Sequence, residues 1–258
     1  MAELGMLPQQ RRQKIFELIR EDGHAKVLNL SRIFKVTEVT IRQDLEKLEE
    51  EGLVIREHGG AYLKNISHNV RNVELLNKDN MSEKVSIAKK AIELVNDGDT
   101  IILDSGSTVT EIAKLISGYK NLTVITNALN IALILGADPD INLVLTGGEF
   151  KAPTLSLTGQ KAADSLEGLH VDKLFLATAG IALKTGLTYP SISDIVVKRA
   201  MIESADLVYL VADHSKIGRS SFASLGALSL IDFLITDSKI SDEYVDLFSD
   251  HDIKLIIA

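Results

Sequence analysis

The sequence predicts an α/β protein in which a small winged helix-turn-helix domain precedes a larger α/β domain. Residues 8–63 contain short amphipathic helical segments followed by two adjacent glycines between apolar runs. From residue 81 to residue 258, helical segments alternate with short runs of Ile, Leu and Val, a pattern typical of helices covering a largely parallel sheet. Residues 64–80 are polar and lack an apolar period, so we expect a linker there.

The first domain is predicted to hold three helices, the second and third of which form a helix-turn-helix over about residues 25–44. The first spans residues 9–20, and the second ends in a turn at Lys35 and Val36. Thr37 offers a side-chain oxygen to cap the third helix, which should run over residues 38–51 and end at Gly52. The predicted inward-facing residues are Ile15, Leu18 and Ile19 on the first helix, Leu30, Ile33 and Phe34 on the second, and Ile41, Leu45 and Leu48 on the third.

A small β-hairpin is predicted after the third helix. Residues 53–55 and 61–63 are its strands, and Gly59-Gly60 supplies the positive-φ freedom of a tight reversal. Arg56 and His58 lie where the tip of such a wing would touch phosphates.

The outward face of the third helix suits the DNA major groove. Arg42 can pair with guanine and Gln43 with adenine through two hydrogen bonds each, while Thr40 can reach a phosphate or a thymine methyl. The alternative is that these polar residues are simply solvated. We favour DNA binding because the cap, the apolar stripe, the stop and the hairpin occur in one register. The expected DNA contacts are Arg11, Arg12, Thr37, Thr40, Arg42, Gln43, Arg56, His58 and Gly59.

Charge limits how a single DNA-binding domain can act. The chain has a formal net charge of −8, and residues 1–63 carry ten Lys and Arg against eleven Asp and Glu. A domain that is not basic overall must rely on locally placed cations, so one copy should bind DNA weakly. We therefore expect a homo-oligomer, a dimer or tetramer, that binds repeated half-sites on double-stranded operator DNA.

Composition excludes several other classes of protein. Hydrophobic content of 45% and charged content of 25% are ordinary for a globular protein, and the absence of Cys excludes disulfides and thiolate sites. Residues 1–13 show no signal peptide, and no apolar run approaches the roughly 20 residues that span a bilayer. We expect a cytoplasmic protein with no membrane partner.

The second domain is predicted to alternate strands and helices as follows. Strands are expected at residues 100–103, 122–125, 142–145, 173–177, 207–211, 233–236 and 253–257. Helices are expected at residues 83–95, 111–116, 131–135, 160–166, 195–204 and 242–248. Ligands of such sheets collect at the carboxyl ends of the strands, so the loops there are the first candidates for a site.

The segment Asp104-Ser105-Gly106-Ser107-Thr108 is the strongest of these loops. It follows a strand and opens a helix, which aims backbone N–H groups, hydroxyls and the helix dipole at one point. It lacks the Gly-Lys-Ser/Thr ending of a nucleotide P-loop, so we infer a small monophosphate rather than ATP. The alternative is a capped strand-to-helix turn without a ligand.

Other polar residues can add to the same site. Asp213 and Lys216 would serve a hydroxyl and a phosphate or else form a surface salt bridge. Asp194 and Lys198 lie one helical turn apart, where a solvated helix face is the favoured interpretation. The effector-binding residues that we expect are Asp104, Ser105, Gly106, Ser107, Thr108, Thr126, Asn127, Gly147, Gly148, Asp194, Lys198, Asp213 and Lys216. The six His residues lack metal-binding spacing and no Gly-x-Ser-x-Gly motif occurs, so no metal, cofactor or catalytic residue is expected.

The chain resembles the DeoR family of bacterial transcription regulators over nearly its whole length, in the branch similar to glycerol-3-phosphate and amino-sugar repressors. In the first domain the resemblance rests on Thr40-Ile41-Arg42-Gln43-Asp44-Leu45 and His58-Gly59-Gly60-Ala61. In the second it rests on residues 104–108, Thr126-Asn127, Thr146-Gly147-Gly148, Asp172-Lys173-Leu174-Phe175, Gly186-Leu187-Thr188, Lys198-Arg199-Ala200-Met201-Ile202 and Asp213-His214-Ser215-Lys216.

This resemblance implies a DNA-binding repressor whose second domain, similar to the sugar-phosphate isomerase and CoA-transferase fold, senses a phosphorylated sugar. Two residues depart from the family pattern: Gln43 stands where a second Arg is common, and Asp194 where Glu is usual. We therefore expect a non-enzymatic repressor of a sugar metabolism operon, released by a phosphorylated sugar or a related metabolite. The alternatives are a sugar-phosphate isomerase fused to a DNA-binding module, with Asp104 or Asp213 as its base, and a DNA binder without a ligand.

Overall fold

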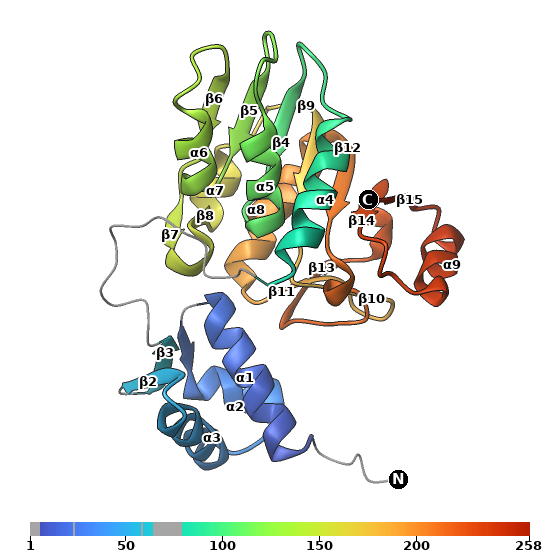
Figure 1. Cartoon of the computed structure of the whole chain (residues 1–258). Coiled ribbons are helices and arrows are strands. Elements are labelled where there is room, and N and C mark those ends of the chain that lie inside the picture. The colour runs from blue at the N-terminus through green and yellow to red at the C-terminus, as the bar shows by residue number, and fades with distance from the viewer. Residues whose placement is uncertain (1–5, 23, 58, 64–78) are drawn as a thin grey trace. The chain divides into compact units, whose positions relative to one another are not determined.

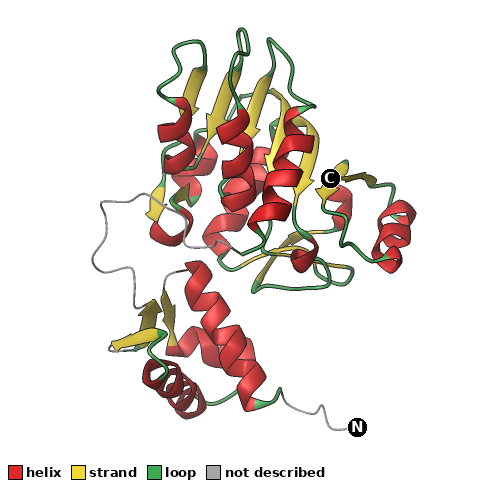
Figure 2. Ribbon diagram, in the orientation of Figure 1, coloured by secondary structure: helices red, strands yellow, loops and turns green. Residues whose placement is uncertain are grey.

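A computed structural model describes residues 6–22, 24–57, 59–63 and 79–258 (Figure 1). The chain divides into two compact units, residues 1–76 and 77–258. Figure 2 shows that the first unit combines helices with a small sheet, while the second is built on a large sheet covered by helices.

The first unit has the predicted helices and hairpin. The helices are α1 (Pro8–Asp22), α2 (Val27–Phe34) and α3 (Glu38–Glu50). The strands are β1 (His24–Lys26), β2 (Val54–Glu57) and β3 (Gly60–Leu63), which pair antiparallel in the order β1-β3-β2. The strand β1 was not predicted, because three residues of mixed polarity carry no periodic signal.

The predicted boundaries and core of α3 are confirmed. The Thr37 side chain accepts a hydrogen bond from the backbone N–H of Thr40 at 3.2 Å, and Gly52 follows the helix with a φ of 73°. The stripe of Ile41, Leu45 and Leu48 is buried in one cluster with residues of α1 and α2, among them Ile15, Ile19 and Leu30.

The two glycines of the wing have different roles. Gly59 has a φ of 86°, as predicted for a tight reversal. Gly60 instead lies against β1, where any side chain would place its Cβ 2.4 Å from the carbonyl oxygen of Ala25. The unpredicted strand therefore explains why the second glycine is needed.

The second unit is centred on a seven-stranded parallel sheet in the order β15-β14-β12-β9-β4-β5-β6. Its strands are β4 (Thr100–Leu103), β5 (Thr123–Thr126), β6 (Asn142–Leu145), β9 (Val171–Leu176), β12 (Ala205–Val211), β14 (Phe233–Thr236) and β15 (Lys254–Ile257). All seven were predicted to within two residues at each end, because runs of Ile, Leu and Val mark strands buried on both faces.

Helices cover both faces of this sheet. In Figure 1, α4 (Met81–Ile92), α5 (Ser107–Leu115) and α6 (Leu129–Leu135) lie in front of it, and they share one apolar cluster. The helices α7 (Gln160–Asp164), α8 (Ile192–Glu203) and α9 (Asp242–Asp250) contribute to the cluster on the other face. The two layers fix the carboxyl ends of the strands along one edge.

Additional strands and short helices lie outside the main sheet. The hairpin of β7 (Glu149–Lys151) and β8 (Ser156–Thr158) follows β6, and β10 (Gly180–Ala182), β11 (Gly186–Tyr189) and β13 (Ala223–Gly226) form a second antiparallel sheet. The short 3-10 helices are η1 (Ala152–Thr154), η2 (His214–Lys216) and η3 (Leu228–Leu230). None of these was predicted, since segments of three or four residues are too short for a periodic pattern.

Candidate DNA-binding surface and candidate effector site

The exposed face of α3 presents the predicted base-reading residues. Gln43 is exposed, and the Arg42 side chain is 52% exposed. The Arg42 guanidinium contacts a Glu38 carboxylate oxygen at 2.8 Å, one helical turn away. The Thr40 hydroxyl lies 3.0 Å from the Thr37 hydroxyl. An exposed ion pair of this kind is weak, so Arg42 can exchange its carboxylate for a base or a phosphate.

Arg11 was predicted to contact DNA, but the structure places it inside the first unit. Its guanidinium is buried and holds the Asp44 carboxylate of α3, with Nε 2.5 Å from Oδ2 and Nη2 3.2 Å from Oδ1. This charge-assisted pair joins α1 to α3 and leaves the guanidinium too enclosed to reach a phosphate. The adjacent Arg12 is half-buried, and it keeps its place among the proposed contacts.

The predicted phosphate contacts of the wing are only partly described. Arg56 lies on β2, and its guanidinium is 3.8 Å from carboxylate oxygens of both Glu46 and Glu49 on α3. Gly59 is exposed at the hairpin tip, whereas His58 lies outside the described residues. The two carboxylates reduce the positive charge that Arg56 offers to DNA.

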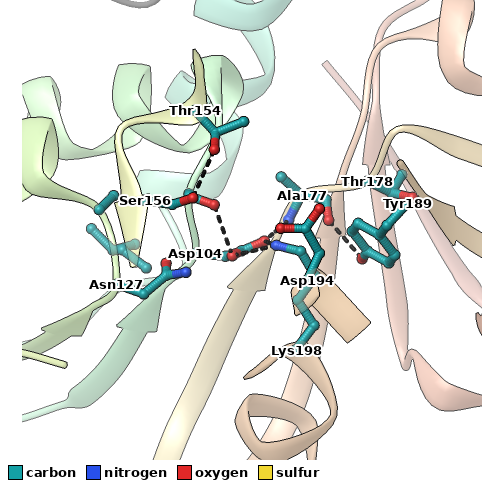
Figure 3. A network of polar contacts seen from close by, with 12 residues as sticks. Asp104, Asn127, Thr154, Ser156, Ala177, Thr178, Tyr189, Asp194 and Lys198 are labelled. Atoms are coloured by element: carbon teal, nitrogen blue, oxygen red, sulfur yellow. Dashed lines mark hydrogen bonds and ion pairs between the residues drawn. The ribbon is translucent and has the colours of Figure 1, made fainter. Parts of the chain in front are cut away.

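In the second unit, Asp104 and Lys198 form a buried ion pair at the carboxyl end of β4 (Figure 3). Lys198 Nζ lies 2.6 Å from each carboxylate oxygen of Asp104. The backbone N–H of Ala177 donates to the same carboxylate at 3.0 Å, and the Ser105 hydroxyl lies 3.4 Å from it. The favoured interpretation of Lys198 as part of a solvated helix face was wrong, because α8 packs this side chain onto the sheet edge.

Tyr189 lies close to Lys198 and was not among the predicted site residues. Lys198 Nζ is 4.9 Å from the centre of the Tyr189 ring, and the phenol donates a hydrogen bond to the carbonyl oxygen of Ala177 at 2.7 Å. Burial raises the pKa of Tyr189 well above its ordinary value, and the negative charge of Asp104 raises it further. The phenol therefore stays neutral and acts as a fixed donor.

The loop after Asp104 leads into α5 through a glycine with a positive φ. Gly106 has a φ of 138°, and a side chain there would place its Cβ 3.0 Å from the Cβ of Ala177. α5 begins at Ser107, so the N–H groups of its first turn have no acceptor within the helix. The Thr108 side chain is buried at the same helix end.

The neighbouring strand β5 ends in two buried polar residues with different roles. The Thr126 hydroxyl donates to the carbonyl oxygen of Leu103 at 2.7 Å and accepts from the backbone N–H of Ala128 at 3.1 Å, so it is used within the fold. The Asn127 amide donates to the carbonyl oxygen of Leu157 at 3.0 Å. Its Oδ1 is buried and has no hydrogen-bond partner among the described residues, which marks Asn127 as available to a ligand.

The glycines after β6 serve a turn. The backbone N–H of Gly147 donates to the Ser165 hydroxyl at 3.0 Å. At Gly148 a side chain would place its Cβ 2.8 Å from the carbonyl oxygen of Thr158. Both positions precede the β7–β8 hairpin; the Gly147 N–H is used within the fold, and Gly148 leaves no room for a side chain.

That hairpin brings Lys151 to Asp194, a contact that was not predicted. Lys151 Nζ lies 2.8 Å from Asp194 Oδ2 at the start of α8, and the two side chains are 11% and 9% exposed. Asp194 is therefore not on a solvated helix face. In the sequence, Lys151 follows Gly147-Gly148 in a segment with no predicted element. Its position alone did not indicate a contact with Asp194.

Asp213 and Lys216 at the end of β12 do not form the alternative surface salt bridge. Asp213 is buried, and its Oδ1 accepts from the Asn80 amide at 2.9 Å and from the backbone N–H of Ser215 at 3.0 Å. Lys216 makes no side-chain hydrogen bond or ion pair with any residue that the structure describes. β12 is separated from β4 by one strand, β9, so both residues lie along the same carboxyl edge.

The described parts of the chain hold neither a cluster of metal-binding side chains nor a membrane-spanning helix. No group of three or more His, Cys, Asp or Glu side chains there could hold a metal ion. None of the helices in those parts is both long and apolar enough to cross a membrane.

Known families match both units. A DeoR-like helix-turn-helix model matches residues 11–67, and a DeoR C-terminal sensor domain model matches residues 79–238. The chain is 37% identical to the HTH-type transcriptional regulator GolR of Listeria innocua, over 98% of this chain and 100% of the relative. It is 32% identical to the glycerol-3-phosphate regulon repressor of Escherichia coli, over 95% of this chain and 97% of that protein.

The chain also has a partial likeness to a solved enzyme. The ribose 5-phosphate isomerase A of Methanocaldococcus jannaschii is 19% identical, with a TM-score of 0.38 over 54% of this chain and 55% of the enzyme. The family assignment rests on the two family models and the full-length relatives. With a DeoR-like helix-turn-helix followed by a DeoR C-terminal sensor domain, the chain belongs to the DeoR family of transcription regulators.

Proposed function

We propose that this protein is a repressor of a sugar metabolism operon that binds operator DNA as a homo-oligomer and releases it when the second unit binds a phosphorylated sugar. The observation that carries the effector half is the buried Asp104–Lys198 pair beside the start of α5, next to the unpaired Asn127 Oδ1. A buried, charged and incompletely satisfied cluster is typical of a ligand site.

In this proposal, the two ends of the effector bind different groups. The first turn of α5, with Gly106, Ser107 and Thr108, holds the phosphate together with Lys216. Asp104, Asn127 and Asp194 bind hydroxyl groups, since a carboxylate accepts and an amide both donates and accepts. The names of two relatives support a sugar-related role: a glycerol-3-phosphate regulon repressor and a putative aga operon transcriptional repressor, both of Escherichia coli strains.

DNA release follows from differential binding. The effector must bind the DNA-free arrangement of the oligomer more tightly than the DNA-bound arrangement. A 10- to 100-fold preference supplies about 1.4 to 2.7 kcal/mol per site. The contributions of the several sites in an oligomer add together.

The isomerase alternative is less well supported. A catalytic base must reach a carbon-bound proton, but both Asp104 oxygens contact Lys198 Nζ and the Asp213 carboxylate accepts hydrogen bonds from Asn80 and Ser215. The full-length relatives reported above are named as regulators.

The test is a gel-shift assay on the promoter fragment nearest the encoding gene, repeated with a panel of sugar phosphates. We expect one sugar phosphate to release the DNA and to raise the unfolding free energy by about 2.7 kcal/mol at 100 times its dissociation constant. Lys216→Ala should reduce the effector response and leave DNA binding intact. A chain that ignores every nearby promoter fragment at low ionic strength contradicts the repressor role.

A further inference from the structure

The β7–β8 hairpin is held against the end of β5, although it belongs to a separate two-stranded sheet. The backbone N–H of Leu157 donates to the carbonyl oxygen of Asn127 at 2.7 Å, and the Asn127 side-chain amide donates to the carbonyl oxygen of Leu157 at 3.0 Å. Ser156, the preceding residue of the hairpin, pairs with Ala128 in an antiparallel bridge. This part of the hairpin therefore lies beside Asn127, whose Oδ1 is buried without a hydrogen-bond partner among the described residues.

The hairpin brings two hydroxyl groups, those of Thr154 and Ser156, to this place. Their oxygens are 2.7 Å apart, and Ser156 is fully buried while Thr154 is half-buried. Leu155, between them, has a φ of 52°, a left-handed conformation that is uncommon for leucine and is often found at ligand sites. Its backbone N–H and carbonyl oxygen are both hydrogen-bonded within the fold, which fixes this turn. Figure 3 shows the two hydroxyl residues and Asn127 grouped beside Asp104.

The hydrogen-bonding capacity left in this group matches a hydroxyl. Whichever of Thr154 and Ser156 donates in their mutual hydrogen bond, the other keeps a proton that has no acceptor among the described residues. Asn127 Oδ1 lacks a donor in the same way. A ligand hydroxyl can donate to Oδ1 and accept the remaining proton, whereas an ammonium group donates only.

The charged side chains nearby also disfavour an ammonium group on the ligand. Lys198 contacts both carboxylate oxygens of Asp104, and Lys151 contacts Asp194. Because each of these carboxylates already has a lysine partner, a further ammonium would be enclosed without a carboxylate of its own, which is strongly unfavourable. A hydroxyl carries no charge, and a carboxylate in an ion pair can still accept a hydrogen bond from it.

We propose that Asn127, Thr154 and Ser156 form a hydroxyl-binding subsite that selects a phosphorylated sugar or polyol without an amino group over an amino-sugar phosphate. This inference rests on the proposed function and keeps the phosphate on the first turn of α5 with Lys216. One hydroxyl of the effector donates to Asn127 Oδ1 and accepts from the hydroxyl pair. An ammonium in its place leaves a buried proton of the pair without an acceptor, so an amino sugar should bind at least about 10-fold more weakly.

Dissociation constants measured by calorimetry on the full-length protein test this selectivity. The probes are pairs that carry either a hydroxyl or an ammonium at carbon 2: glucose 6-phosphate and glucosamine 6-phosphate, galactose 6-phosphate and galactosamine 6-phosphate, and glycerol 3-phosphate and serinol phosphate. We expect the tightest ligand to be a hydroxyl member, and Ser156→Ala should weaken it about 10-fold but its amino partner less. Ser220→Ala is the matched control, because it removes a hydroxyl from an exposed pair with Thr185 of the same 2.7 Å separation, and it should leave the ratio of the two affinities unchanged.

Asn127→Asp tests the part played by charge. It replaces the amide oxygen by a carboxylate in the same place and gives an ammonium its own partner, so the amino sugar should gain affinity relative to the hydroxyl sugar. A purely structural role predicts that Ser156→Ala and Asn127→Asp lower the melting temperature but keep the wild-type ratio, and that result overturns the inference.

The wild-type protein provides a second way to reject the inference. An amino-sugar phosphate that binds as tightly as its hydroxyl partner, or more tightly, overturns the proposed selectivity. A protein that binds operator DNA but none of the sugar phosphates contradicts the proposed effector itself, which distinguishes the two failures.

Discussion

The two units of this chain place their charged side chains differently. On α3, the pairs Arg42–Glu38 and Lys47–Glu50 join residues within one helical turn, and all four side chains are more than 40% exposed. In the second unit, the Asp104–Lys198 pair joins residues 94 positions apart and is buried. Exposed pairs exchange partners at little cost, which suits contacts with phosphates and bases, whereas buried pairs hold a fixed geometry, which suits recognition of a small molecule.

The Arg11–Asp44 pair shows that a buried ion pair also occurs in the first unit. The contrast between buried and exposed pairs therefore depends on the role of each pair and not on the unit that contains it. The Arg11–Asp44 pair is buried within the first unit and joins α1 to α3. It holds the recognition helix in place, while the exposed residues of the same helix remain free to meet DNA. Variants at both kinds of pair distinguish fixed buried pairs from exchangeable exposed pairs.

The largest expected effect is that of Lys198→Met. Removing one member of a buried pair leaves the Asp104 carboxylate uncompensated, so the unfolding free energy of the second unit should fall by about 3–5 kcal/mol. Urea unfolding monitored by circular dichroism measures it. Lys90→Met, at an exposed pair with Glu93, is the control and should change stability by less than about 0.5 kcal/mol. Equal effects of the two variants would abolish the contrast.

Arg11→Ala should come next, with a loss of about 3 kcal/mol confined to the first unit. Asp44 would be left buried without its partner, and operator binding would fail because α3 loses its anchor on α1. Hydrogen exchange of the two units measures the effect, and residues 79–258 should keep their wild-type protection. Arg12→Ala should instead weaken DNA binding without unfolding. Normal DNA affinity of a folded Arg11→Ala protein would show that the buried pair is dispensable.

Arg42→Ala should weaken operator binding by about 1–3 kcal/mol while stability changes little, because its exposed pair with Glu38 contributes little to folding. Arg42→Lys is the matched control, since it keeps the charge but cannot form the two-pronged contact with guanine. Fluorescence anisotropy with operator and with random DNA separates the two effects. If Arg42→Lys retains full specificity, Arg42 contacts only the backbone.

Thr37→Ala should lower the unfolding free energy by about 1 kcal/mol through loss of the α3 cap. Thr37→Ser keeps the accepting oxygen and should behave as the wild type. Thermal melting of the full chain provides the measurement. A Thr37→Ala protein as stable as the serine variant would mean that the cap does not support the recognition helix.

The smallest expected effect concerns pH. The hydrogen bond from Lys239 lowers the pKa of Glu83 from 4.5 to about 2. A carboxylate whose pKa is lower in the folded state stabilises the fold above pH 4.5, and this contribution is lost as the pH falls towards 2. Glu83→Gln should therefore remove part of the acid sensitivity of the second unit between these values. Identical acid unfolding curves for the variant and the wild type would contradict this role of the exposed Lys239.

Local patterns in the sequence were sufficient for the elements that depend on neighbouring residues. The cap at Thr37, the stripe of Ile41, Leu45 and Leu48, and the seven buried strands all follow from spacings within a few positions. The short strands β1 and β7 were missed because three residues carry no period, and each is defined by its partner across the sheet.

The candidate site shows the same difference between features that depend on neighbouring residues and features that depend on distant ones. The sequence by itself identified the loops at the carboxyl ends of β4 and β5, because parallel strands bring their ends to one edge. Only the tertiary structure decided that Arg11 faces Asp44 and not DNA, that Lys198 meets Asp104, and that Lys151 meets Asp194. An ion pair between distant positions depends on how whole helices and hairpins pack, and no local spacing records that packing.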